Sequence, residues 1–347
     1  MEYTPVSKYV KIIGRTLEKN GILWLVQSGA AISFIVKGKY AAVTLAGDDS
    51  IENNRDFRSR YAVMVDGKII IDDVISLRKK EIILFDKKVT QTSEVKIIHL
   101  SEAVRGAVGV ENILVKSDDG NFVMPAEKKK LSIEFIGDSI TCAYGVEGKD
   151  SSEPFKTTTE NFMKSYAYLT AEKLDADYSA VSYSGHGVMS GYTSDGKMNE
   201  KDIVPPFYGK IGKTPEYALE WDFKSHKNDI IVINLGTNDS NYVNQNRMQR
   251  SVEFKKAYVK FLKDVREKNT DAYIFCTVGL MGGGMYQYVS EAVVDYRIET
   301  GDKRITSFEL EMQKLSDGVG SDWHPSEITQ RKAADAVAKR ILKVLEN

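Results

Sequence analysis

SIEFIGDSIT, residues 132–141, is the stretch that decides the fold of this chain. Its apolar half has the length and composition of a buried strand, and Gly137-Asp138-Ser139 ends that strand abruptly. A hydroxyl at this point stands at the edge of a sheet, where a helix is expected to begin. The stretch therefore raises the question of what Ser139 does there.

Apolar segments of strand length alternate with segments of helical period from about Glu127 to the end of the chain. The strand-like segments are SIEFIG, DYSAVSYSG, DIIVINLG, AYIFCTVG and RITSFEL. The clearest helical segments are 161–174, 251–268 and 326–346. Continuous apolar strands separated by such helices predict a parallel sheet covered on both faces. We expect residues 126–347 to form a three-layer α/β/α domain with a five-stranded parallel sheet.

The first part of the chain has a different rhythm, with short β-branched runs separated by turns. Seven such runs fall between residues 22 and 116, and this spacing is typical of a β-sandwich or barrel. The pair Asp66-Gly67 favours a tight hairpin between VMV and KIIID. We expect residues 1–125 to form an all-β, jelly-roll-like sandwich.

Composition excludes several classes of protein. The 347 residues carry a net charge of −1 without a long basic run, so the electrostatic footprint of a nucleic-acid-binding protein is missing. No stretch approaches the roughly 18 apolar residues of a membrane span, and the first residues lack the apolar core of a secretory signal. Two cysteines, Cys142 and Cys276, indicate no disulfide framework. We expect a cytoplasmic protein with no nucleic-acid or membrane partner.

Polar residues follow three successive strands of the predicted parallel sheet. Ser139 comes after the first strand, Gly185 after the second and Asn238 after the third. Ligands of open parallel sheets bind outside the carboxyl ends of the strands. The sequence therefore predicts one site that contains all three residues.

A serine nucleophile needs a base, usually histidine, and the chain has four histidines. His99 lies in a strand-like segment and is interpreted as structural. His226 precedes the third strand and is expected at the opposite end of the sheet. His186 and His324 remain as candidate bases on the predicted rim.

His324 has the more favourable local sequence of the two. Asp322 could hold the tautomer of its imidazole and stabilise the imidazolium that forms when Ser139 loses its proton. Two alternatives stay open: the segment DWHPSE only caps the last helix through Ser326, and Asp322 is solvated surface.

Acyl transfer also needs donors for the developing oxyanion. The candidates are the backbone N–H groups of Ser139 and Gly185 and the side-chain amide of Asn238. The alternatives are a simple turn at Gly185 and an Asx-type turn at Asn238. Their order at the carboxyl ends of successive strands favours the shared site.

GDSIT, SGHG, GTND and DWHP resemble, in order, the four sequence blocks of the SGNH (GDSL-type) hydrolases. The resemblance implies that Ser139 is the nucleophile and that His324 is the base. It also implies an oxyanion hole formed by the Ser139 N–H, Gly185 and Asn238.

One departure from the common family pattern concerns the third member of the triad. That pattern places aspartate three residues before the histidine, where this chain has Ser321. The D-x-H spacing of Asp322 and His324, together with a preceding β-sandwich, is similar to carbohydrate esterase family 2, whose members remove acetyl groups from xylan and related sugars. Some members are thought to use a Ser-His dyad helped by a backbone carbonyl, so a dyad and a triad with Asp322 both stay open.

Other chemistries lack their motifs. No GxSxG elbow and no phosphate-binding loop occur. The conceivable zinc set is His186, His324 and Asp138, and we expect no metal and no cofactor. Cys142 is interpreted as buried packing rather than as a thiol nucleophile.

The resemblance implies a serine esterase that removes O-acetyl groups from xylan-derived or related oligosaccharides. Trp323 and Tyr192 are candidate substrate contacts, and Tyr144 and Tyr286 are further aromatics near the rim. Two alternatives are an SGNH lipase or thioesterase and a non-catalytic carbohydrate-binding protein. The sequence is compatible with a homo-oligomer but identifies no interface.

Overall fold

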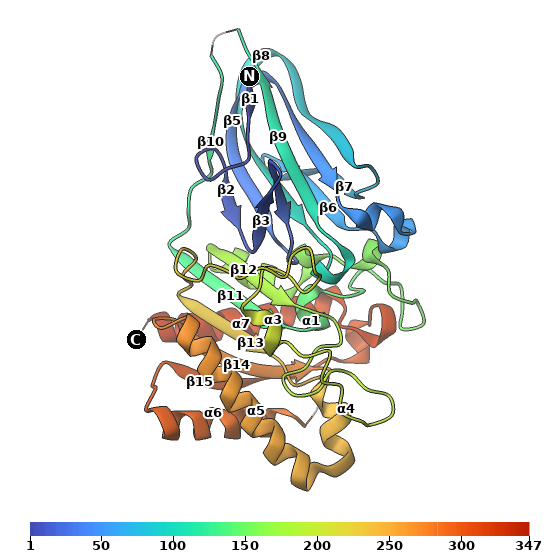
Figure 1. Cartoon of the computed structure of the whole chain (residues 1–347), viewed down its shortest axis with the longest axis vertical. Helices are drawn as coiled ribbons and strands as arrows, with labels where there is room; N and C mark the ends of the chain where they lie inside the picture. Colours follow the sequence, from blue (N-terminus) through green and yellow to red (C-terminus); the bar gives the residue numbers. More distant parts are fainter. Residues whose placement is uncertain (119, 283, 347) are drawn as a thin grey trace.

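The computed structural model describes residues 1–118, 120–282 and 284–346, which form two β-sheets joined end to end. A tall, curled antiparallel sheet stands over an α/β layer, and the N-terminus lies at the far end of the curled sheet (Figure 1). Among the described helices, none is long and apolar enough to cross a bilayer.

The first sheet contains ten antiparallel strands, and its main path runs β3-β4-β9-β5-β8-β6-β7. Its strands are β1 (Glu2–Tyr3), β2 (Lys11–Ile13), β3 (Thr16–Lys19), β4 (Ile22–Leu25), β5 (Ala31–Gly47), β6 (Arg60–Val65), β7 (Lys68–Val74), β8 (Lys79–His99), β9 (Val108–Lys116) and β10 (Phe122–Pro125). The expected hairpin at Asp66-Gly67 is confirmed, since both turn residues have positive φ and Val65 pairs with Lys68.

The all-β class of this part is confirmed, but its strands are longer than the sequence suggested. Gly38 reads as a break between two short strands, yet β5 continues through it, with register shifts against β8 after Gly38 and after Ala41. Such irregularities bend a strand without ending it. The long strands curl around one apolar core, which includes Phe34, Tyr61 and Ile97.

The second sheet contains five parallel strands in the order β12-β11-β13-β14-β15, as expected. The strands are β11 (Leu131–Gly137), β12 (Ala176–Ser182), β13 (Ile230–Asn234), β14 (Tyr273–Leu280) and β15 (Ile305–Met312). The helices are α1 (Ser139–Cys142), α2 (Tyr166–Lys173), α3 (Pro205–Tyr208), α4 (Asp239–Val243), α5 (Arg247–Lys268), α6 (Tyr286–Thr300) and α7 (Glu327–Leu345).

Helices cover both faces of the parallel sheet, which confirms the three-layer fold. One core joins apolar strand residues such as Ile233 to Phe261 of α5 and Val289 of α6. The other joins the opposite strand face, including Val232, to α2 and to Val337 of α7. Because successive strand residues point to opposite faces, fully apolar strands such as β13 supply both cores.

The base of the curled sheet merges with both of these cores. Leu100, which follows β8, belongs to the core beneath α2 and α7. Ala103 and Ala107 belong to the core beneath α5 and α6. A fully buried ion pair between Arg15 and Glu134 also crosses the junction at 2.9 Å. The two sheets therefore pack as one body and not as modules on a linker.

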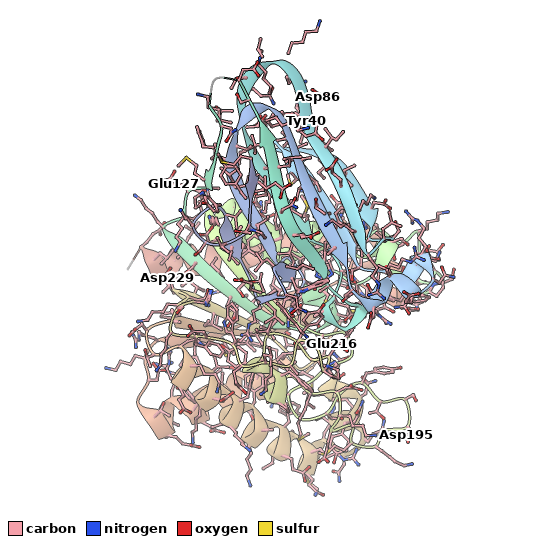
Figure 2. All side chains as sticks on the ribbon, turned by 45° about the horizontal axis from the view of Figure 1, so that its top comes forward. Tyr40, Asp86, Glu127, Asp195, Glu216 and Asp229 are labelled. Atoms are coloured by element: carbon pink, nitrogen blue, oxygen red, sulfur yellow. The ribbon has the colours of Figure 1, made fainter. Side chains whose placement is uncertain are left out.

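The strand order places a switch point between β11 and β13. The chain goes from β11 to β12 on one side, then crosses to β13 on the other side of β11 and continues outward to β14 and β15. Clefts at such switch points, at the carboxyl ends of the strands, are where α/β sheets bind ligands. Figure 2 marks the two ends of the sheet: Asp229 lies before β13, and Asp195 lies on the opposite side in the loop after β12.

Candidate active site

Ser139 is the first residue of α1, directly beyond the carboxyl end of β11. Asp138 caps this helix, because its Oδ1 accepts a hydrogen bond from the Ile140 N–H at 3.0 Å. The turn is too tight for a side chain at position 137, where a Cβ would lie 2.0 Å from the Oγ1 of Thr141. The strand-to-helix turn thus leaves the Ser139 hydroxyl at the rim, with 7% of the residue exposed.

The structure brings Ser139 and His324 together. The Ser139 hydroxyl lies 2.9 Å from the Nε2 of His324. The other ring nitrogen, Nδ1, lies 3.2 Å from the backbone carbonyls of Ser321 and of Asp322. Because a carbonyl only accepts, Nδ1 carries the proton and Nε2 is free to accept the serine proton.

Burial lowers the pKa of His324 to about 4, against the opposing effects of the two carbonyls and of the Asp322 charge. The imidazole is therefore neutral at pH 7, which is the state that a general base requires. The same loop also begins α7, because the Ser326 hydroxyl accepts a hydrogen bond from the Thr329 N–H. Helix capping and placement of the imidazole are two functions of one segment.

The triad alternative requires a hydrogen bond between the Asp322 carboxylate and the imidazole, and no such bond is found among the described residues. Asp322 and Trp323 adopt left-handed conformations, with φ of 48° and 64°. This conformation directs the carbonyl of Asp322 toward Nδ1, while its carboxylate accepts a hydrogen bond from the Tyr144 hydroxyl at 2.7 Å. The geometry is that of a Ser-His dyad assisted by backbone carbonyls.

Tyr144, one of the aromatics near the rim, supports the imidazole. Its ring stacks on His324 with 4.1 Å between centroids, and its other side stacks on Phe155 at 4.3 Å. Burial and the Asp322 carboxylate raise the pKa of Tyr144, so its hydroxyl stays protonated as a donor. Tyr144 thus has no free face on which a sugar could stack.

The three candidate oxyanion donors lie around the same rim. Gly185 has a φ of 77°, and an added Cβ would meet no atom within 4 Å, so the glycine is required by its backbone conformation and not by crowding. Within the described residues, the N–H groups of Ser139 and Gly185 donate to no other residue. They are therefore available to a ligand.

Asn238 is held by two acceptors in the absence of a ligand. Its amide nitrogen lies 2.9 Å from the carbonyl of His186 and 3.2 Å from the Oδ2 of Asp138. The longer contact is the weaker one. An oxyanion beside Ser139 would compete with Asp138 for the amide N–H that makes this longer contact.

Two buried aspartates organise this side of the site, and sequence reasoning assigned them no such role. Asp239 accepts hydrogen bonds from the N–H groups of three consecutive residues, Val188, Met189 and Ser190. Burial raises the pKa of Asp239 and raises that of Asp138 to about 7. Both residues lie within the GDSIT and GTND motifs, so the motifs themselves carried the signal.

His186 lies on the same rim but is not free to act as a base. Its Nδ1 lies 2.9 Å from the Ser184 carbonyl, and its Nε2 accepts from the Lys213 ammonium at 2.7 Å. Burial lowers the pKa of His186 to about 4, with a further contribution from Lys213.

The remaining two histidines lie away from this constellation. His99 is fully buried beside the Ser101 hydroxyl, as expected for a structural residue. His226 packs against Trp221 in a tilted arrangement with 4.2 Å between ring centroids, and it lies before β13, at the other end of the sheet.

The two candidate substrate contacts are exposed aromatics that flank the site. Trp323 immediately precedes the base and is 56% exposed. Tyr192 is 57% exposed, and its N–H donates to the Gly185 carbonyl at 2.8 Å. Tyr286, also near the rim, is half-buried with its hydroxyl 3.5 Å from that of Ser307.

Cys142 is fully buried, and burial raises the pKa of its thiol well above the ordinary value. It is therefore a protonated packing residue and not a nucleophile. In the described part of the chain, the one set of three metal-ligand side chains within 4.8 Å of one another is Glu102, Cys142 and Glu160. The conceivable zinc set of His186, His324 and Asp138 is not such a cluster.

Comparison with known families identifies the fold around this site. A family model described as GDSL-like Lipase/Acylhydrolase matches residues 133–337, which include all four motifs. The chain belongs to this family. Membership agrees with the Ser139 to His324 hydrogen bond and confirms the resemblance to the SGNH hydrolases.

Two relatives of this GDSL-like chain carry esterase names. Cellulase/esterase CelE of Acetivibrio thermocellus is 36% identical over 222 residues, which are 62% of this chain and 26% of the relative. The chain thus spans about a quarter of the length of CelE. An acetylxylan esterase / glucomannan deacetylase of Cellvibrio japonicus is 24% identical over 348 residues, covering 97% of this chain and 89% of the relative.

A solved structure reproduces both sheets of the GDSL-like chain. A family two carbohydrate esterase from Clostridium thermocellum in complex with cellohexaose superposes with a TM-score of 0.83 at 28% identity, covering 97% of this chain and 99% of that one. The expected likeness to family 2 carbohydrate esterases is therefore confirmed over both sheets.

Proposed function

We propose that this protein is a serine esterase that removes O-acetyl groups from xylan-derived or related oligosaccharides through an acetyl-enzyme intermediate. The observation that carries the proposal is the 2.9 Å contact between the Ser139 hydroxyl and the Nε2 of a neutral His324. It lies on the rim that also holds the unengaged N–H of Gly185 and the amide of Asn238. A nucleophile, a base and oxyanion donors are the parts that acyl transfer needs.

In the first half of the reaction, the oxygen of Ser139 bonds to the acetyl carbonyl carbon while its proton passes to Nε2 of His324. The other proton stays on Nδ1, which donates it in hydrogen bonds to the backbone carbonyls of Ser321 and Asp322, and these carbonyls stabilise the imidazolium. The carbonyl oxygen becomes an oxyanion among the Ser139 N–H, the Gly185 N–H and Asn238. Collapse of the tetrahedral intermediate breaks the bond to the sugar oxygen, which takes the proton from Nε2.

In the second half, water attacks the acetyl-enzyme. Its proton passes to Nε2 of His324, the same oxyanion donors stabilise the second tetrahedral intermediate, and Ser139 leaves with the proton returned to its oxygen. No redox step and no external electron donor enter this sequence. Each turnover consumes one water and releases one acetate.

The carbohydrate part of the proposal is supported by the exposed aromatics and by the names of the relatives. Trp323 stands on the side of the base and Tyr192 on the side of Gly185, so both could contact the sugar rings that flank an acetylated position. Flat aromatic faces suit sugar rings because the ring C–H groups are apolar. The names of CelE and of the Cellvibrio japonicus relative point to esters of plant polysaccharides.

The test compares acyl substrates on one enzyme. Acetate release from acetylated xylo-oligosaccharides should exceed the rate on long-chain esters and on acyl thioesters, and Ser139→Ala should abolish it. A faster rate on long-chain esters or thioesters would favour a lipase or thioesterase. Failure of an active-site serine probe to label the native protein would favour a carbohydrate-binding protein that has lost catalysis.

A further inference from the structure

Glu102 lies between two strands of the first sheet, but its side chain contacts a loop of the α/β layer. It follows β8 and precedes the short 3-10 helix η3 (Ala103–Arg105). The residue is fully buried. Apolar neighbours on each side, Leu100 and Ala107, anchor this segment in the two cores of the α/β layer.

The carboxylate of Glu102 holds the loop that carries Gly185. Its Oε2 accepts a hydrogen bond from the N–H of Ser184 at 2.9 Å. Ser184 is the residue directly before Gly185, so this bond fixes the chain one peptide away from the oxyanion donor. The later part of the same loop is fixed by Asp239. At its start, the Ser184 carbonyl and the Gly185 carbonyl are bound within the loop itself, by His186 and Tyr192, whereas Glu102 reaches the Ser184 N–H from the segment after β8.

Glu160 lies beside Glu102 and contacts its backbone. The Oε2 of Glu160 accepts from the N–H of Glu102 at 3.0 Å. Burial and the neighbouring Glu102 charge raise the pKa of Glu160 well above its ordinary value. The raised pKa favours the protonated form of Glu160, because its carboxyl group is buried beside a second acidic side chain.

Arg105, three residues further along, contacts the other half of the site. Its guanidinium lies 4.7 Å from the centre of the Phe155 ring. Phe155 stacks on Tyr144, and Tyr144 stacks on His324. The column from Arg105 to the imidazole is continuous, and the Arg105 Nε also lies 3.6 Å from the Oε1 of Glu102.

We propose that Glu102–Arg105 braces the active site from the first sheet, and that Glu102 is a positioning residue for the oxyanion loop. This inference rests on the proposed esterase function and deepens it. The first sheet then contributes to turnover itself, through the placement of Gly185, whatever it contributes to sugar binding.

The experiment compares three variants with the native enzyme on p-nitrophenyl acetate and on an acetylated xylo-oligosaccharide. Glu102→Met fills the space but leaves the Ser184 N–H without an acceptor, whereas Glu102→Gln keeps an acceptor oxygen. A loop displaced by about 1 Å lowers kcat by roughly 10- to 100-fold, which we expect for Glu102→Met on both substrates with KM little changed. Glu102→Gln should recover most of that loss.

Glu160→Gln is the matched control, because a carboxamide mimics the protonated carboxyl in the same buried cluster without contacting Ser184. We expect it to retain native kcat. Hydrogen exchange adds a second measurement, in case Glu102→Met does not fold. The amides of residues 183–187 should exchange faster in Glu102→Gln than in Glu160→Gln, since only the first substitution changes the group that accepts from the Ser184 N–H.

Three results would overturn the proposal. They are a folded Glu102→Met variant with native kcat, an equal loss of kcat in Glu160→Gln, and equal exchange at residues 183–187 in the two glutamine variants. A loss confined to KM on the oligosaccharide would assign Glu102 to sugar binding instead and would also contradict it. If the native enzyme cleaves neither ester, the esterase function fails, and the exchange experiment still tests the brace.

Discussion

His186 and His324 occupy similar environments on the same rim. His186 is buried and His324 is half-buried, and desolvation lowers the pKa of each to about 4. Both direct Nδ1 toward backbone carbonyls two or three residues earlier in the chain. In pKa and tautomer, the two imidazoles are close to equivalent.

They differ in the group that faces Nε2. At His324 this group is the Ser139 hydroxyl, which has a proton to give. At His186 it is the Lys213 ammonium, which is itself held by Asp202 at 2.8 Å. A neutral, buried histidine is therefore not a general base until a nucleophile occupies the position opposite its free nitrogen.

The largest effect should separate these two histidines. We expect His324→Ala to lower kcat by about 10⁴- to 10⁶-fold, as loss of the base does in other serine hydrolases. His186→Gln should cost no more than about 10-fold, because Asn238 is positioned by the backbone carbonyl of His186 and by the Oδ2 of Asp138, and the substitution removes neither. Steady-state kinetics on an acetyl ester, with unfolding midpoints for both variants, makes the comparison. Similar losses in the two variants would show that a lowered pKa matters more than the group opposite Nε2.

The next effect concerns pH. Because burial lowers the pKa of His324 to about 4, the imidazole remains neutral, and catalytically competent, down to that pH. We expect log kcat/KM to stay level from pH 7 to about 5 and then to fall with a slope of one as imidazolium forms.

The His186→Gln variant should keep this acid limb, although the pKa of His186 in the native protein is also about 4. Loss of the limb in that variant would assign the ionisation to His186. A limb near pH 6.5 in the native enzyme would mean that the imidazole is more solvated than the structure indicates.

The smallest effect concerns Asp322. Its charge raises the pKa of His324, so Asp322→Asn should move the acid limb of kcat/KM to lower pH. At pH 7 the rate should change by less than about 5-fold, because the asparagine oxygen can still accept from Tyr144 and the backbone carbonyls still hold Nδ1. A fall of 10³-fold or more would mean that the carboxylate acts directly on the imidazole.

The positions of Ser139, Gly185 and Asn238 could be predicted because strand ends are visible in sequence. An apolar run followed by small polar residues marks the carboxyl end of a strand, and parallel strands bring those ends together. The curl of the first sheet was not visible in this way, since Gly38 interrupts the pattern of β5 without ending the strand.

The function of the Asp322 side chain could not be predicted, because it depends on two backbone torsions. In an ordinary conformation a D-x-H spacing could bring the carboxylate to the imidazole. With left-handed φ values at Asp322 and Trp323, the backbone carbonyl of Asp322 faces the imidazole instead of its carboxylate. Glu102 was hidden for another reason. It lies 82 positions from Ser184, and no local pattern indicates so distant a contact.

The acceptor for the Nδ1 proton of His324 belongs to the main chain. A single codon change can delete a catalytic carboxylate, but none can delete a peptide oxygen. A lineage that preserves the shape of this loop therefore preserves the tautomer of its base whichever amino acid occupies position 322. A copy that has lost catalysis would be recognised by a missing serine or an altered loop, and not by a missing aspartate.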